Sequence, residues 1–370
     1  MTAERAVALV DLGAVERNCA HLAAQLGDAE LCAVVKADGY GHGADGCAAA
    51  ALSGGASRLA VATAREAEQI GRRLPHVTLL TMGALTPGEL DVALAAGSEI
   101  AVWRDGFLRL VADRARAQGR TARVHIKHDS GMGRLGTADT AELMALVEGC
   151  ERASELKLTG LWTHFATADE RDSDYLDEQL RRFGPLAEEV KAAHPEITVH
   201  AANSAATLRE PDSHFDMARC GIAIYGLDPF GEDPASRGLE PALELRSYVA
   251  DVKRFAAGAS AGYGRSWSAP EDTWVGILPI GYGDGVRRAL SNNAEVLVGG
   301  RRRPLVGTVS MDNVTIDLGA ETDVEPGAEA VLIGAQGEER ILAEELARRI
   351  GTINYEITCG ISSRVPRVVP

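Results

Sequence analysis

The chain has 370 residues, and at roughly 150 residues per domain this length predicts two domains. Acidic residues (53) outnumber Lys and Arg (38), so the formal net charge of −15 argues against nucleic acid or an anionic membrane as the main partner. A hydrophobic content of 46% with 25% charged residues is that of an ordinary globular protein and excludes a disordered or fibrous chain.

Short β-rich apolar runs alternate with helical patterns through the first two thirds of the chain. Because each gap is long enough for a crossover helix, the pattern predicts repeated βα units and a parallel sheet. The runs are residues 7–12, 31–35, 58–61, 77–80, 99–102, 122–126, 156–163, 198–201 and 220–225. A closed (β/α)8 barrel takes eight strands, so we expect one terminal strand outside it.

The pattern changes after about residue 238, where strands follow one another closely. These runs are residues 246–255, 273–280, 294–298, 304–309, 314–318 and 330–333, and only residues 342–350 keep a helical pattern. The turn-rich segment 233–238 predicts the boundary. We therefore expect a (β/α)8 barrel over residues 1–238 and a mainly β domain over residues 239–370.

Cysteine spacing and the N-terminus indicate a compartment. The cysteines at positions 19, 32, 47, 150, 220 and 359 show no Cys-x-x-Cys spacing, so we expect reduced, mostly buried thiols and no metal site. The apolar run 6–10 is interrupted by Asp11, which is too early for a signal peptide, and no stretch approaches ~18 apolar residues. We expect a soluble cytoplasmic protein.

In a (β/α)8 barrel, chemistry is located at the carboxyl ends of the strands. The run 32–35 ends in Lys36, followed by Tyr40 and by three glycines within five positions, 39–43. A lysine at a strand end can simply reach solvent. Glycines, however, let a backbone approach a ligand closely, so they also favour a binding role.

The run 122–126 ends in Lys127, and a formal G-x-G-x-x-G follows at residues 131–136. This motif suggests a dinucleotide site. Against that, the following strand ends in Thr163-His164 instead of an acidic residue, and the motif lies in the middle of the barrel.

Two further residues have alternative interpretations. Ser204 can cap a helix, or its hydroxyl beside backbone N–H groups can bind a phosphate. Arg219, in apolar surroundings, needs an acceptor, which is either a structural carboxylate or a ligand.

The segment 34–43, VVKADGYGHG, resembles the pyridoxal-phosphate lysine motif of the alanine racemase family. The resemblance continues through residues 131–136, 219–226, 262–264, 279–285, 311–312 and 354–367, and so covers essentially the whole chain. It implies a (β/α)8 barrel followed by a β domain, and a head-to-tail homodimer with shared active sites.

The resemblance also implies the catalytic groups. Lys36 is the lysine that binds pyridoxal phosphate covalently and acts on one face of the substrate. Tyr263 of the partner subunit acts on the opposite face, with His164 as the contact that lowers its pKa. Arg219 faces the pyridine nitrogen and keeps it unprotonated, which suppresses transamination.

The family's remaining contacts correspond to residues in both expected domains. Those that match the phosphate contacts are Tyr40, Ser204, Gly221, Ile222 and Tyr355. Arg134 matches the group near the cofactor phenolic oxygen and the substrate carboxylate, Met311 offers it a backbone N–H, and Tyr282 with Tyr355 narrows the access. Lys127 matches a lysine that many relatives carry as N-carboxylysine, whose negative charge would hold an arginine in place.

The expected function is interconversion of L-alanine and D-alanine, which supplies D-alanine for cell-wall peptidoglycan. One alternative is a racemase of another small amino acid such as serine. Another is a pyridoxal-phosphate decarboxylase, which predicts a carboxylate at the pyridine nitrogen instead of Arg219. A non-catalytic carrier leaves Tyr263 and the chain after residue 239 unexplained, and an oxidoreductase would depend on the glycines at 131–136.

Overall fold

The computed structural model describes residues 4–370, which form two compact units. The barrel unit contains residues 15–40 and 44–224, and the mainly β unit contains the described residues up to Ala14, residues 41–43 and residues 225–370. The expected division at 238/239 lies downstream of this one. Residues 225–238 associate with the mainly β unit through backbone bonds, such as that from Ala242 N–H to the Tyr225 carbonyl (3.0 Å).

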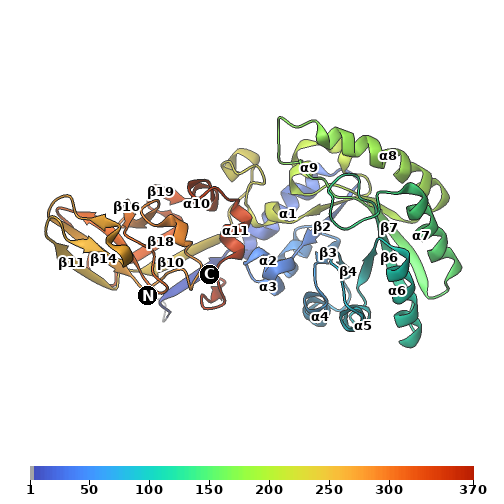
Figure 1. Cartoon of the computed structure of the whole chain (residues 1–370), viewed down its shortest axis with the longest axis horizontal. Helices are drawn as coiled ribbons and strands as arrows, with labels where there is room; N and C mark the ends of the chain where they lie inside the picture. Colours follow the sequence, from blue (N-terminus) through green and yellow to red (C-terminus); the bar gives the residue numbers. More distant parts are fainter. Residues whose placement is uncertain (1–3) are drawn as a thin grey trace. The chain divides into compact units, whose positions relative to one another are not determined.

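Eight parallel strands close the barrel unit in chain order, so the predicted (β/α)8 architecture is confirmed (Figure 1). The strands are β2 (Glu30–Val34), β3 (Arg58–Val61), β4 (Thr78–Thr81), β5 (Glu99–Val102), β6 (Ala122–Lys127), β7 (Leu156–Trp162), β8 (Thr198–His200) and β9 (Met217–Cys220).

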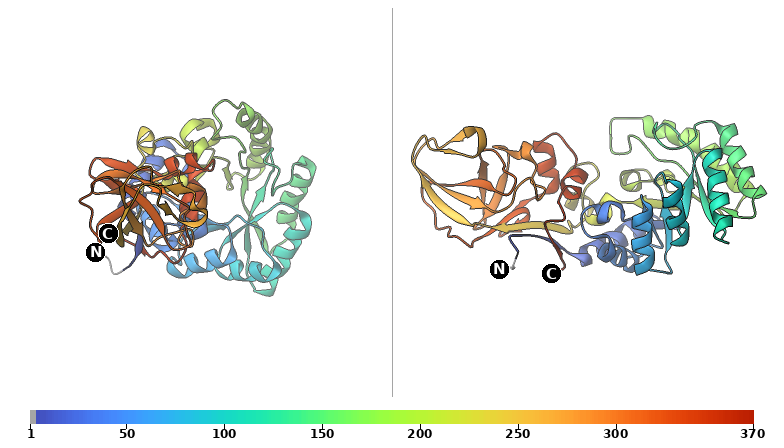
Figure 2. Two further views of the ribbon diagram at one scale, coloured as in Figure 1. Left: turned by 60° about the vertical axis from the view of Figure 1, so that its left-hand side comes forward. Right: turned by 60° about the horizontal axis from the view of Figure 1, so that its bottom comes forward.

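Helices lie around the outside of this barrel (Figures 1 and 2). They are α1 (Leu12–Gln25), α2 (Lys36–Tyr40), α3 (Ala44–Ser53), α4 (Ala64–Arg73), α5 (Pro87–Ala95), α6 (Asp105–Ala117), α7 (Thr140–Arg152), α8 (Tyr175–Ala193) and α9 (Ser204–Arg209), with short 3-10 turns η1 (Pro211–Ser213) and η2 (Ile222–Tyr225).

Local sequence explains why several of these elements begin where they do. Thr63 accepts a hydrogen bond from the Glu66 N–H, and the Glu66 side chain accepts one in return from the Thr63 N–H, which closes a capping box at α4. Thr86 and Glu89 repeat this arrangement at α5, with Pro87 at the first helical position. Such reciprocal bonds satisfy backbone donors that a helix start leaves unpaired.

The two terminal strand predictions for the barrel have different outcomes. The expectation that one strand lies elsewhere is confirmed, because β1 (Ala6–Val10) belongs to the sheet of the mainly β unit. The prediction of a strand over residues 220–225 is wrong: β9 ends at Cys220 and Ile222–Tyr225 forms η2. This run is apolar because it is buried, and burial alone does not distinguish a strand from a turn.

The mainly β unit contains a sheet with the strand order β11-β14-β17-β16-β15-β18-β10-β1-β20, and β19 pairs with β18. Its strands are β1, β10 (Leu243–Tyr248), β11 (Asp251–Phe255), β14 (Thr273–Leu278), β15 (Glu295–Val298), β16 (Arg301–Val306), β17 (Val314–Gly319), β18 (Glu329–Gln336), β19 (Glu339–Ile341) and β20 (Arg367–Val368). Outside this sheet are β12 (Ser260–Ala261), β13 (Trp267–Ser268), α10 (Ala343–Arg349), α11 (Asn354–Cys359), η3 (Pro234–Arg237), η4 (Tyr263–Arg265) and η5 (Arg288–Leu290).

The prediction of a mainly β domain is confirmed, with two differences in detail. The run 246–255 is two strands, because β10 pairs with β18 up to Tyr248 whereas β11 pairs with β14 from Asp251. The six-residue helix α11 was not predicted, because so short a helix shows no readable periodicity. Residues 41–43 join this unit through a bond from Arg367 Nε to the Gly41 carbonyl (2.9 Å) and stacking of His42 on Tyr225.

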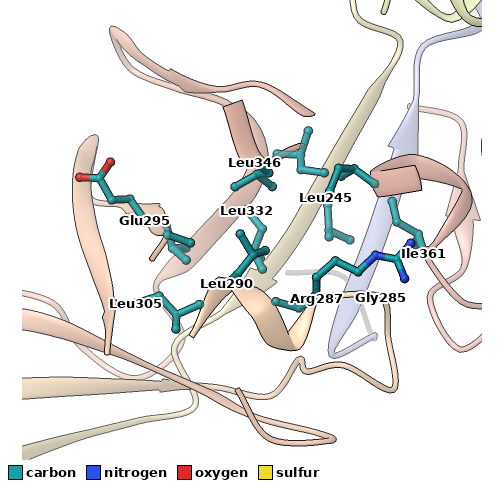
Figure 3. A pocket seen from close by; sticks show the side chains of 14 residues that line it. Leu245, Gly285, Arg287, Leu290, Glu295, Leu305, Leu332, Leu346 and Ile361 are labelled. Carbon is teal, nitrogen blue, oxygen red and sulfur yellow. The ribbon is translucent and has the colours of Figure 1, made fainter. Parts of the chain in front are cut away.

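Leucine side chains converge in the core of the mainly β unit around a gap of about 20 Å³ (Figure 3). The gap is lined by Leu245, Leu290, Leu332 and Leu346, among others. A space of this size, with so apolar a lining, is a packing irregularity and not a site for a substrate.

The prediction that the cysteines are mostly buried is confirmed, because five of the six are buried and Cys359 is exposed. All six are free thiols in the structure. Burial raises the pKa of Cys32 to about 12, so this thiol is unreactive at neutral pH. Among residues 4–370, no group of His, Cys, Asp or Glu is arranged to hold a metal ion. Over the same residues, no helix is both long and apolar enough to cross a bilayer.

Candidate active site

Lys36 follows the carboxyl end of β2, where a (β/α)8 barrel carries its chemistry. The next residues form a left-handed turn, with φ of 52° at Ala37 and Asp38, 62° at Gly39 and 53° at Tyr40. A left-handed conformation costs roughly 1–2 kcal/mol for each residue other than glycine. Backbone strain is therefore concentrated between Lys36 and Tyr40, as is common where a ligand is held.

Side chains from outside the turn stabilise it. The Ala37 N–H donates to Glu66 Oε1 (2.7 Å), so the capping glutamate of α4 also supports the turn. The Asp38 carboxylate accepts a bond from the Ala44 N–H (2.9 Å) at the start of α3. The Nζ atom of Lys36 lies 5.9 Å from the centre of the Tyr40 ring. The glycine pattern located this segment, but the strained residues include three that are not glycine.

Ser204 and Tyr40 meet the backbone at Gly221. The Ser204 hydroxyl accepts bonds from the N–H groups of Gly221 (3.0 Å) and Ala223 (3.3 Å). A Cβ atom at Gly221 would lie 2.3 Å from Tyr40 Oη, so glycine is required for this close approach. The hydroxyls of Ser204 and Tyr40, beside Ile222 at the start of η2, are groups that can donate to an anion such as a phosphate.

The helix-capping interpretation of Ser204 is wrong. Asn203 caps α9, because its side-chain oxygen accepts a bond from the Ala206 N–H (2.9 Å). The Ser204 hydroxyl is thereby left for the loop after β9. The sequence offered a signal for this, since asparagine is at least as good a cap as serine.

Arg219 lies in β9, only 3% exposed, and its recorded hydrogen-bond partners are all neutral. Nη1 lies 2.8 Å from His200 Nδ1, and Nη2 donates to the carbonyls of Thr163 and Ala201, both at 2.9 Å. Nη2 also lies 3.1 Å from His164 Nδ1. Burial lowers the pKa of Arg219 to about 10, which leaves it a cation at neutral pH. None of these contacts is the structural carboxylate that was one of its two predicted acceptors.

His164 is held as a neutral ring. Burial, reinforced by the Arg219, Lys127 and Arg134 cations, lowers its pKa well below the ordinary value. An arginine can only donate, so His164 Nδ1 is the acceptor in its contact with Arg219. The proton of His164 is therefore on Nε2.

Lys127 ends β6 and is 2% exposed. Its Nζ lies 4.4 Å from the centre of the Trp162 ring. Burial, together with the nearby guanidinium groups of Arg134 and Arg219, lowers the pKa of Lys127 to about 7. A large share of this amine is therefore unprotonated, and thus nucleophilic, at neutral pH.

The glycine-rich loop before Arg134 folds around a carboxylate. Asp129 accepts bonds from the N–H groups of Gly131 and Gly133 (both 3.1 Å) and of Arg134 (3.2 Å). In a dinucleotide site such amides would face the pyrophosphate. Because Asp129 occupies them, the loop positions Arg134 and does not bind a dinucleotide, so the oxidoreductase alternative has no site here.

Four of the predicted residues belong to the mainly β unit. Tyr263 begins η4 between two glycines with φ of 72°, and it is 72% exposed. Met311 and Tyr282 are 51% and 43% exposed and lie on adjacent loops, where Tyr282 N–H donates to the Ser310 carbonyl (2.9 Å). Tyr355 is half-buried in α11.

Two residues of the barrel site were missed by sequence reasoning. Trp162 contacts the Lys127 amine and also the Arg219 guanidinium, whose Cζ lies 4.8 Å from the ring centre. It stacks on His200, with centroids 5.5 Å apart and planes at 8°. Both stand at the carboxyl ends of their strands, Trp162 in β7 and His200 in β8, so their positions carried the signal.

Comparisons with known proteins match both units. Residues 10–229 match the family model "Alanine racemase, N-terminal domain", and residues 242–369 match "Alanine racemase, C-terminal domain". An alanine racemase of Frankia casuarinae is 41% identical over 98% of this chain and 96% of its own length. One of Symbiobacterium thermophilum is 43% identical over 97% and 95%. A solved alanine racemase of Streptomyces coelicolor A3(2) superposes with a TM-score of 0.94 at 40% identity, covering 99% of this chain and 98% of that chain.

Proposed function

The chain belongs to the alanine racemase family, and on this premise we propose that it interconverts L-alanine and D-alanine with pyridoxal phosphate as its cofactor. The observation that carries the proposal is full-length similarity to alanine racemases at about 40% identity, across both family domains. The buried cations at the strand ends of the barrel unit support it independently.

The barrel unit fits a phosphorylated cofactor. Pyridoxal phosphate, when bound, accepts the electron pair that is left when the α-proton of an amino acid is removed. Lys36 would hold it covalently and Arg219 would face its ring nitrogen. Its phosphate would be bound by Tyr40, Ser204, Gly221, Ile222 and Tyr355. The Ser204 hydroxyl supports this assignment, because it accepts bonds from the N–H groups of Gly221 and Ala223 and keeps its own proton to donate to a phosphate oxygen.

Racemisation requires proton transfer on both faces of the substrate α-carbon. Lys36 is the base on one face, and Tyr263 of the partner subunit is the base on the other. A free tyrosine has a pKa near ~10, so it needs a neighbouring donor to act at neutral pH. His164, neutral with its proton on Nε2, is available to donate to that phenolate oxygen. The 72% exposure of Tyr263 supports a role across a subunit boundary in a homodimer with shared active sites.

Arg219 controls the outcome at the ring nitrogen. A guanidinium donates a hydrogen bond but does not give up its proton, so the nitrogen facing it stays unprotonated. The electron sink is then weaker, which favours return of the proton to the α-carbon over transamination. The neutral partners of Arg219 support this role, because none of them is an acid that would protonate the nitrogen instead.

Lys127 is proposed to carry a carboxyl group. Its neutral amine attacks carbon dioxide, so that a nitrogen–carbon bond forms and one amine proton is released. The product is an anion that can hold Arg134, whereas an ammonium would repel it. The lowered pKa of Lys127, about 7, supports this step because it makes the neutral amine abundant. Intact mass in bicarbonate buffer should show the added group, and a fully active, unmodified protein would contradict the assignment.

Arg134 and the Met311 N–H are proposed to bind the substrate carboxylate, while Tyr282 and Tyr355 narrow the access. A narrow pocket discriminates only weakly against one additional hydroxyl, so we expect slower turnover of serine. We propose a cytoplasmic role in supplying D-alanine for peptidoglycan.

The test is the optical rotation of L-alanine over time with purified protein and added pyridoxal phosphate, followed by chiral chromatography. Decay to an equimolar mixture of enantiomers with total alanine unchanged is the expected result. Loss of total alanine would point to decarboxylation or transamination. Unchanged L-alanine would refute the proposed substrate.

A further inference from the structure

A chain of buried hydrogen bonds runs through the barrel interior from Arg219 to Glu99. Arg219 Nη1 lies 2.8 Å from His200 Nδ1, and His200 Nε2 lies 2.8 Å from His125 Nδ1. His125 Nε2 lies 2.7 Å from Glu99 Oε2. Both histidines are 0% exposed, and Glu99 is 1% exposed. None of the roles assigned above involves His125 or Glu99.

The chemistry of these groups determines where every proton lies. Arginine has no acceptor, so His200 Nδ1 must be unprotonated and its proton must be on Nε2. That N–H donates to His125 Nδ1, which therefore places the His125 proton on Nε2, facing the Glu99 carboxylate. The chain thus has one allowed direction, from cation to anion, with both imidazoles neutral. Burial and, to a smaller extent, repulsion by the Arg219 cation lower the pKa of His200 well below its ordinary value, which agrees with a neutral ring.

The fold makes specific room for this chain. A Cβ atom at Gly160 would lie 2.1 Å from His125 Nδ1, so the His125 ring occupies space that only a glycine leaves open. The β6–β7 pairing is shifted between Val124 and His125, which brings His125 opposite Gly160. Trp162, which lies in β7 like Gly160, stacks on the His200 ring of β8 and so restricts the plane of that ring.

Glu99 anchors the far end of the chain. Its Oε1 lies 2.5 Å from Arg123 Nη2, and its Oε2 lies 3.3 Å from Arg58 Nη1. Arg123 is about half exposed at the start of β6. The direct hydrogen-bond partners of Arg219 are neutral, and the nearest carboxylate in this series of bonds is that of Glu99, reached through His200 and His125.

We propose that Glu99 and His125 are positioning residues for the reaction: through His200 they hold Arg219 with its donor groups aimed at the cofactor ring nitrogen. This inference rests on the proposed function for its kinetic consequences. The chain keeps an acceptor against Nη1, which prevents Arg219 from rotating toward other carbonyls. Loss of His125 would leave the buried His200 Nε2–H group unpaired and remove the restraint on the orientation of Arg219.

The first test uses His125→Phe, which keeps a ring but removes both nitrogens, beside His125→Gln, which keeps one acceptor and one donor. Ile100→Val, a buried change next to Glu99, is the matched packing control. In the holoenzyme we expect His125→Phe to lower kcat for racemisation about tenfold or more, which corresponds to ~1.4 kcal/mol. The KM for alanine should change little, and the pyruvate formed per racemisation event should rise.

His125→Gln should recover most of kcat and of the racemisation-to-transamination ratio, and Ile100→Val should leave both within about twofold of the original protein. A folded His125→Phe variant with unchanged kcat and ratio would overturn the proposal. Equal losses in all three variants would do so as well, because they would show a packing effect only.

The second test requires no activity and no variant. Nitrogen NMR of protein labelled at histidine, recorded with and without pyridoxal phosphate, reports which ring nitrogen carries the proton. Neutral Nε2–H forms at both His125 and His200 at pH 8 are expected. A doubly protonated ring, or an Nδ1–H form at either residue, would contradict the proposed series of hydrogen bonds from Arg219 to Glu99. If the unaltered protein does not racemise alanine but these forms are observed, the proposed substrate is wrong and the proposed series of hydrogen bonds is still supported.

Discussion

The barrel unit buries two cationic side chains of its candidate site, Lys127 and Arg219, whereas the mainly β unit exposes Tyr263. Lys127 and Arg219 are 2% and 3% exposed, while Tyr263 is 72% exposed. Burial lowers the pKa of both groups and restricts their orientation, so they can act on a ligand with little rearrangement. An exposed side chain such as that of Tyr263 is not held in one orientation until another surface covers it. The two units therefore contribute chemistry in different ways, and the following experiments test this difference.

The largest expected effect is at Lys36. We expect Lys36→Ala to lower racemase activity by about 10³-fold or more, because it removes both the covalent attachment and a base. Activity and the visible absorbance of bound pyridoxal phosphate measure this. Lys157→Ala, at an exposed position of β7, is the matched control and should retain both. Normal absorbance in Lys36→Ala would contradict the assignment.

Tyr263→Phe tests the exposed group of the mainly β unit. We expect a loss of roughly 10²–10⁴-fold in kcat, the range of general acid–base catalysis. Cofactor absorbance should be retained, because Tyr263 is not assigned to cofactor binding. In D2O the variant should still exchange the α-proton of one enantiomer, which has Lys36 on its reactive face. Equal exchange of both enantiomers at the original rate would show that Tyr263 is not the second base. Tyr248→Phe, in β10 of the same unit, is the control.

The burial of Lys127 predicts a pH-dependent stability. Its pKa falls from 10.5 to about 7 in the folded chain, so the unfolded chain binds more protons between these values. Stability should therefore rise with pH from 7 to 10.5, and this contribution should be lost as pH falls toward 7. The effect is on the order of a few kcal/mol.

Urea unfolding of the unmodified protein in carbon-dioxide-free buffer, at several pH values between 7 and 10.5, measures how steeply the free energy of unfolding rises with pH. Lys127→Met removes the titrating amine and should flatten this dependence. An equal slope in the variant would show that the pH dependence arises elsewhere.

The smallest effect is expected at Gly221. Gly221→Ala would bring a Cβ within 2.3 Å of Tyr40 Oη and so displace the phenol from the loop that is proposed to bind the phosphate. We expect roughly tenfold weaker binding of pyridoxal phosphate by fluorescence titration, equivalent to about 1.4 kcal/mol. Gly88→Ala, in α5 with no heavy atom near the added Cβ, should leave the affinity unchanged. Equal affinities in both variants would argue against a phosphate at Gly221.

Much of the architecture was readable from local sequence. Apolar runs located seven of the eight barrel strands to within a few residues, because parallel buried strands leave a continuous hydrophobic signal. The same reasoning placed Lys36 and Lys127 at strand ends, where chemistry was expected. It failed at residues 220–225, where burial resembles a strand but the hydroxyl of Ser204 takes the backbone N–H groups instead.

The sequence by itself determined the barrel, the β-rich second half and the strand-end lysines, because these follow from periodicities of a few residues. Only the tertiary structure decided that β1 leaves the barrel, that Asp129 occupies the amides of the glycine-rich loop and that Glu99 is connected to Arg219 through two histidines. Those outcomes depend on which distant side chains share a buried space. His125 and His200, for example, are 75 positions apart, and their bond exists because two strands and a glycine leave room for both rings.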